Sequence, residues 1–133
     1  RLVMWVLDTN TLIYFFKGMG RVPEKLLSTA PSDIAIPAIV LYELEVGIAK
    51  SSAPHKRRQQ LNALTAAAQV LPFGLPEAEA AAVIRTRLEK NGQPIGAYDV
   101  LIAATAIAQK ATLVTHNTRE FERIKGLTLE DWF

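Results

Sequence analysis

An unbroken apolar run near the start of the chain constrains the fold most. The residues from Val3 to Leu7 are all apolar, and the polar sequence Asp8-Thr9-Asn10 follows at once. A strand that is apolar throughout is typical of a parallel sheet covered on both faces. In a strand with one face exposed to solvent, apolar and polar residues would alternate. The polar residues that follow are typical of a helix N-terminus. The sequence therefore predicts a strand followed by a helix, with Asp8 at the carboxyl end of the strand.

The rest of the chain continues this alternation of short strands and helices. Further strands are predicted at residues 34–36, 70–71 and 112–115. Helices are predicted at residues 11–16, 38–49, 54–68, 77–90, 98–110 and 119–124, with a short one opening at Pro23. Strands that alternate with helices form βαβ units with parallel strands. We therefore expect an α/β fold whose central, mostly parallel sheet of four to five short strands is flanked by helices.

Length and composition limit the classes of protein that this chain can represent. With 133 residues, of which 50% are hydrophobic and 21% charged, residues 1–133 should form a single globular domain. The absence of cysteine excludes a disulfide framework, a thiolate zinc site and a thiol nucleophile, and it favours a cytoplasmic location. The run that ends at Leu7 is too short to cross a membrane, so no membrane association is expected.

Four acidic residues occupy strand ends or apolar helices, where an uncompensated carboxylate would be costly. They are Asp8, Glu43, Asp99 and Glu120. The carboxyl ends of parallel strands share one edge of the sheet, so these acids can meet there. Two unit charges 4 Å apart repel by about 4 kcal/mol at an effective dielectric of about 20, which a divalent cation would relieve.

The types of ligand available narrow the choice of cation and of chemistry. A set of oxygen ligands in a chain with no cysteine and only two histidines favours Mg²⁺ or Mn²⁺ over zinc. Such an ion suits hydrolysis of a phosphate ester by an activated water. Thr9 and Asn117 would then orient a water or a phosphate oxygen.

Each residue of the site also has a purely structural interpretation. Asp8 can equally be interpreted as an N-cap alone, and Asp99 as a first-turn acid that only favours the helix dipole. Glu43 and Glu45 lie about 200° apart around a helix, so only one of them can face the site, and Glu45 is expected at the surface. Glu120 lies in a short charged segment that could be an ordinary solvated face.

The two histidines are expected to have structural or solvent roles. His55 opens the basic run that continues to Arg58, which is typical of a solvated helix face, although it could contact RNA phosphates. His116 lies beside the predicted site but has no evident partner for acid–base chemistry.

Four motifs together resemble the PIN-domain ribonucleases, most closely the VapC-type toxins of bacterial toxin–antitoxin pairs. They are Leu7-Asp8-Thr9-Asn10, Tyr42-Glu43-Leu44-Glu45-Val46-Gly47, Ile95-Gly96-Ala97-Tyr98-Asp99 and Val114-Thr115-His116-Asn117-Thr118-Arg119-Glu120-Phe121. The resemblance implies a PIN-like fold and an Mg²⁺- or Mn²⁺-dependent endoribonuclease, with the first three family acids on Asp8, Glu43 and Asp99. Many PIN domains have an aspartate where this chain has Asn117, and Glu120 is the natural substitute.

The resemblance also implies partners. They are an RNA substrate, with transfer RNA as the family-level expectation, and a cognate antitoxin whose C-terminal segment covers the active-site groove. A homodimer is expected as well, with promoter DNA bound only through the antitoxin. Two alternatives stay open: a catalytically weak PIN-like module that binds an antitoxin, and a structure-specific deoxyribonuclease.

Overall fold

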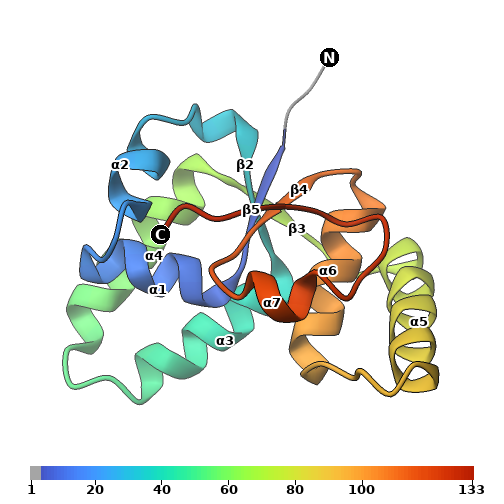
Figure 1. Ribbon diagram of the computed structural model, residues 1–133. Coiled ribbons are helices and arrows are strands. Elements are labelled where there is room, and N and C mark those ends of the chain that lie inside the picture. The colour runs from blue at the N-terminus through green and yellow to red at the C-terminus, as the bar shows by residue number, and fades with distance from the viewer. Residues whose placement is uncertain (1–3) are drawn as a thin grey trace.

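A central sheet of five strands organises the part of the chain that the structure describes (Figure 1). The computed structural model describes residues 4–133. The strands are β1 (Trp5–Leu7), β2 (Ile34–Pro37), β3 (Gln69–Leu71), β4 (Thr112–Val114) and β5 (Thr128–Glu130). They lie in the order β3-β2-β1-β4-β5, and every neighbouring pair is parallel. The predicted α/β fold is therefore confirmed.

Strand β1 lies at the centre of the sheet because its residues can be buried on both faces. Val6 pairs with Ala35 of β2 on one side and with Leu113 of β4 on the other, and all three are fully buried. This burial confirms the interpretation of the apolar run as a central strand. The predicted first residue of the strand, Val3, lies outside the described residues.

Within residues 4–133, seven helices surround the sheet. They are α1 (Thr9–Lys17), α2 (Val22–Leu27), α3 (Ala38–Ala49), α4 (Pro54–Ala67), α5 (Leu75–Lys90), α6 (Ala97–Ala108) and α7 (Thr118–Phe121), with a 3-10 turn η1 at Pro31–Asp33. In Figure 1 the helices α1, α2 and α4 lie on one side of the view and α5 and α6 on the other, while α3 contacts both α1 and α6. None of the helices between residues 4 and 133 has the length and apolar character that spanning a bilayer would need.

Local capping explains where two helices differ from the predicted boundaries. Helix α1 begins at Thr9, two residues before the predicted start, because the Asp8 side chain accepts a hydrogen bond from the Thr11 N–H at 2.9 Å and caps the first turn. Helix α5 begins at Leu75 rather than at residue 77. There the Glu77 carboxylate accepts a hydrogen bond from the Gly74 N–H at 2.8 Å, so Gly74 is the N-cap residue and the helix starts immediately after it.

Helix α6 is the most deeply buried helix of the molecule. Its central residues are almost fully shielded from solvent, from Ile102 to Ala106. Many of them are small, so the helix can pack closely on its neighbours. This burial confirms the predicted deep position, and it fixes the first turn of α6, which carries Asp99.

The last residues form a strand and a tail that the sequence alone did not locate. After β5, Trp132 is buried and its ring lies 5.8 Å from the ring of Trp5, centroid to centroid. The ring of Phe133 stacks on the ring of His116, with 4.3 Å between the ring centroids. The Phe133 carbonyl accepts a hydrogen bond from the Arg21 backbone N–H at 2.8 Å. Gly20 (φ +61°) permits this approach, because a Cβ there would lie 2.8 Å from the Phe133 carbonyl oxygen.

Candidate functional site

The carboxyl ends of β1 and β4 define the position of the site. Asp8 follows β1, and Thr115 follows β4; the Asp8 N–H donates to the Val114 carbonyl at 3.2 Å and so connects the two strand ends. In the sheet, β2 lies on one side of β1 and β4 on the other. The chain therefore leaves β1 towards one edge of the sheet and later adds β4 on the opposite side of β1. Ligand sites of parallel sheets lie at this kind of switch point.

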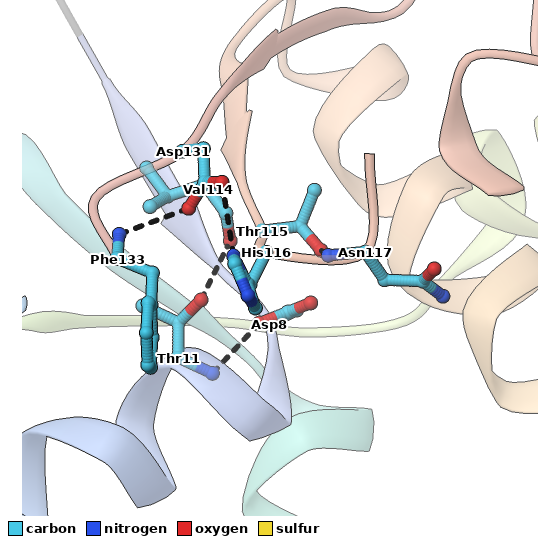
Figure 2. A network of polar contacts seen from close by, with 8 residues as sticks. All are labelled: Asp8, Thr11, Val114, Thr115, His116, Asn117, Asp131 and Phe133. Atoms are coloured by element: carbon cyan, nitrogen blue, oxygen red, sulfur yellow. Dashed lines mark hydrogen bonds and ion pairs between the residues drawn. The ribbon is translucent and has the colours of Figure 1, made fainter. Parts of the chain in front are cut away.

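Asp8 is buried, with 5% of its surface exposed. Figure 2 shows it beside Thr115 and in its capping contact with Thr11. Burial raises the pKa of the Asp8 carboxyl, and hydrogen bonds with Thr115 and Thr11 offset part of that rise. The structural interpretation as an N-cap is confirmed. It does not exclude a second role, because the backbone cap uses only the oxygen Oδ1.

Glu43 reaches the site from helix α3, which begins directly after β2. Its side chain is half-buried, and Oε1 accepts a hydrogen bond from the Thr9 hydroxyl at 2.5 Å. Glu45 faces solvent instead and forms an ion pair with Arg58, with N···O distances of 2.5 and 2.8 Å. The two glutamates thus face differently, as their spacing predicts, and Glu43 is the one beside the start of α1.

Asp99 lies in the first turn of α6, after the N-cap residue Gly96. Desolvation raises the pKa of the half-buried Asp99 carboxyl to about 6, with further contributions from the negative charges of Glu120, Asp8 and Glu43, in that order. The fold therefore brings four acids from distant parts of the chain into one electrostatic environment. A cation there would favour the ionised form of Asp99.

Glu120 and Asn117 lie together after β4. The Asn117 side-chain amide donates to Glu120 Oε2 at 3.1 Å, and the Asn117 backbone N–H donates to the Thr115 hydroxyl at 3.0 Å. Because the Glu120 charge contributes to the raised pKa of Asp99, Glu120 faces the site rather than solvent alone. Asn117 holds this glutamate by its amide.

The donor atoms around the site suit a hard divalent cation. They are carboxylate oxygens, with the hydroxyl of Thr9 and the amide of Asn117 next to them, which are the groups that Mg²⁺ and Mn²⁺ accept. No lysine or arginine in the described part of the chain forms an ion pair with these four carboxylates. Within residues 4–133, no three Asp, Glu or His side chains are clustered tightly enough to hold an ion as they stand. Glu43 and Glu120 are instead hydrogen-bonded to Thr9 and Asn117.

Two residues near the site were not predicted from the sequence to belong to it. Asp131 forms an ion pair with His116 at 2.9 Å, so the expectation that His116 lacks a partner is wrong (Figure 2). The negative charge of Asp131 also contributes to the raised pKa of Asp8. Thr115 is fully buried between Asp8 and Asn117. Its place at the end of a predicted strand was a usable signal, whereas nothing local pointed to Asp131.

Comparisons with known proteins agree with this geometry. The family model for the PIN domain matches residues 5–127. The chain is 36% identical over 135 residues to Ribonuclease VapC2 of Rickettsia felis, and the alignment covers 98% of each chain. It is 34% identical over 131 residues to the tRNA(fMet)-specific endonuclease VapC of Salmonella typhimurium, covering 98% of this chain and 99% of that one.

A solved structure gives the same result. The structure of VapBC2 from Rickettsia felis bound to a DNA fragment from their promoter contains a chain that superposes with a TM-score of 0.90 at 36% identity. The superposition covers 98% of this chain and 100% of that chain. The likeness therefore extends over the sheet, the surrounding helices and the segments that carry the four acids.

Proposed function

This chain belongs to the PIN-domain family, and on that basis we propose that it is a metal-dependent endoribonuclease acting as the toxin of a toxin–antitoxin pair. The observation that carries the proposal is that Asp8, Glu43, Asp99 and Glu120 lie around the carboxyl end of a parallel sheet, and no lysine or arginine of residues 4–133 forms an ion pair with any of them. Relatives that align over nearly the whole chain are ribonucleases by name, which supports the same activity here.

Asp8, Glu43, Asp99 and Glu120 would hold the cation, Mg²⁺ or Mn²⁺. When bound, the ion supplies Lewis-acid chemistry, lowering the pKa of the attacking water and neutralising charge that develops on the phosphodiester. Thr9 fixes the Glu43 carboxylate through its 2.5 Å hydrogen bond, and Asn117 fixes that of Glu120 at 3.1 Å. These two neutral donors orient the acids without cancelling their charge, so the site keeps its attraction for a cation.

The partners follow from the same family membership. The substrate is RNA, and transfer RNA is the first to test because one relative is named for a transfer RNA. The protein acts in the cytoplasm, forms a homodimer and is inhibited by a cognate antitoxin. We infer that promoter DNA is bound only through that antitoxin; the solved VapBC2 structure from Rickettsia felis contains a promoter DNA fragment.

Cleavage of total bacterial RNA by the antitoxin-free protein tests the proposal. The wild-type protein and the Asp99→Asn variant are incubated with Mg²⁺, with Mn²⁺ and with a chelator, and new RNA ends are mapped by sequencing. We expect discrete ends that require the metal and are absent with Asp99→Asn. Full activity of a folded Asp99→Asn protein would refute the site assignment.

The same assay distinguishes the alternatives. Cleavage of a branched or single-stranded DNA by a protein that leaves RNA intact would identify a deoxyribonuclease. A folded protein that binds Mg²⁺ and its antitoxin but cleaves neither nucleic acid would be an interaction module.

A further inference from the structure

A groove leads away from the site between helices α1 and α3. It has a volume of about 360 Å³, and Glu43 lies at one end of it. Its apolar floor is formed by Ile13, Phe16, Leu44 and Ile48. Figure 1 shows α1 and α3 next to each other, with α4 close to both. Between Glu43 and the end of α3 at Ala49 the groove follows six residues of helix, which is about 9 Å, and it continues to Ser51 and Ser52 beyond the helix.

Two cations line the end of the groove that is far from Glu43. They are Lys17, the last residue of α1, and Arg57, in the first turns of α4. The Arg57 guanidinium donates to the Phe16 carbonyl at 3.3 Å and to Gln60 Oε1 at 2.8 Å, which holds it in place. Neither cation forms an ion pair with a carboxylate in the part of the chain that the structure describes. Their charge is therefore available to an anion.

Gly47 keeps the wall of the groove low. It lies inside α3, where glycine destabilises a helix relative to alanine, and its backbone does not require glycine because its φ is not positive. A Cβ built at this position meets nothing within 4 Å. Neither backbone strain nor a tight contact therefore explains why this residue is glycine. The absence of a side chain does leave the groove open to another molecule.

We propose that this groove binds the RNA nucleotide adjacent to the scissile phosphate. Lys17 and Arg57 bind the phosphate of that nucleotide, and the apolar floor receives its sugar and base. The inference rests on the proposed ribonuclease function, and it names the part of the protein that grips the substrate beside the acids. A single-stranded RNA fits best, because its bases are free to leave the strand and pack on apolar or aromatic side chains.

Binding of RNA by cleavage-deficient protein tests the inference. The probe is a fluorescein-labelled single-stranded RNA spanning the cleavage site mapped with the wild-type protein, and anisotropy is measured in the Asp99→Asn background. Lys17→Gln should weaken binding by about tenfold, as expected for a lost charge-assisted contact. It should also reduce the slope of log K against log salt by about 0.7, the value for one phosphate contact on a single strand. Gly47→Leu should weaken binding without changing that slope.

Matched variants control for charge and for added volume. Lys90→Gln removes the same charge from the last residue of α5, and Ala78→Leu adds an apolar side chain on the exposed face of that helix. Both should bind RNA as the parent does. Thermal melting shows whether Gly47→Leu remains folded, and we expect it to be at least as stable as the parent because it replaces a helical glycine.

The outcomes separate this inference from the proposed function. If the wild-type protein cleaves RNA but Lys17→Gln and Gly47→Leu bind it as the controls do, the groove proposal is wrong and the ribonuclease stands. If Gly47→Leu loses only inhibition by the antitoxin, the groove binds a peptide and the nucleotide proposal is also wrong. If the wild-type protein cleaves no RNA, the proposed function itself fails.

Discussion

At the scale of single residues, Asp99 links the site to the stability of the fold. Its pKa is about 6 in the folded protein, against an ordinary value of 3.8. Between these values the folded chain binds a proton that the unfolded chain does not, so the stabilisation by this proton is present at low pH. It is lost as the pH rises through about 6.

Asp99→Asn should therefore stabilise the metal-free protein at pH 7.5, where the wild-type side chain is ionised and repelled by its neighbours. At pH 5 the gain should be about half as large, because the folded wild-type carboxyl is then mostly protonated while the unfolded one, with its ordinary pKa of 3.8, is already ionised. Urea unfolding in the presence of a chelator at both pH values measures this difference. Asp33→Asn, in η1, is the control. A gain for Asp99→Asn of equal size at both pH values would contradict the argument.

The hydrogen bond from Thr9 to Glu43 gives a second prediction at this scale. Thr9→Val keeps the branched shape but removes the hydroxyl that fixes the Glu43 carboxylate at 2.5 Å. We expect a loss of metal affinity or of RNA cleavage of about 10- to 100-fold, which is typical when a group that orients a ligand is removed. Titration calorimetry with Mn²⁺ measures the affinity. Thr9→Ser should restore most of it, and failure of that rescue would argue against the orienting role.

At the scale of secondary-structure elements, the start of α5 depends on one side chain. Glu77 is buried, with 6% exposed, and accepts the hydrogen bond from the Gly74 N–H that begins the helix. Glu77→Ala should lower the free energy of unfolding by about 1 kcal/mol or somewhat more, as loss of a helix cap does. Glu79→Ala, in the same turn but exposed, should change it much less. Urea unfolding of both variants tests this, and equal effects would show that the cap contributes little.

Elements with a strong local pattern were predictable from the sequence. The run before Asp8 had to be buried on both faces, and Val6 and Leu7 are fully buried in β1. Strand β5 was not located because Thr128–Glu130 is only three residues long, lies at the edge of the sheet and has an exposed first residue. It becomes a strand through pairing with β4, at a register of Thr112 with Thr128, and such long-range pairing has no local signal.

The site shows the same division between local and long-range signals. An acid in apolar sequence is locally unusual, so Asp8 and Asp99 could be selected from the sequence. The ion pair of His116 with Asp131 could not, since it depends on the path of the chain after β5. The sequence also could not show that Thr9 and Asn117 are the partners of Glu43 and Glu120, because side-chain hydrogen bonds follow from the packed geometry.

At the scale of the whole molecule, we expect metal binding and folding to be coupled, because no lysine or arginine of residues 4–133 forms an ion pair with the four site carboxylates. A ligand that binds only the folded state adds about 2.7 kcal/mol of stability at a concentration 100 times its Kd. Mg²⁺ should therefore raise the Tm of the wild-type protein at pH 7.5, and by less at pH 5, where protons compete for Asp99. Differential scanning fluorimetry over a range of Mg²⁺ concentrations measures the shift. An equal shift for Asp99→Asn would place the ion elsewhere.

The packing of Trp132 on Trp5 determines what the intrinsic emission of this protein reports. The chain has two tryptophans, and both lie at the contact between the tail and β1. Tryptophan emission therefore monitors one junction, whereas far-ultraviolet circular dichroism averages over all the helices. An emission change at lower urea than the dichroic change would mean that the tail leaves the sheet while the helices are still folded. Coincident curves would mean that the tail and the sheet unfold as one cooperative unit.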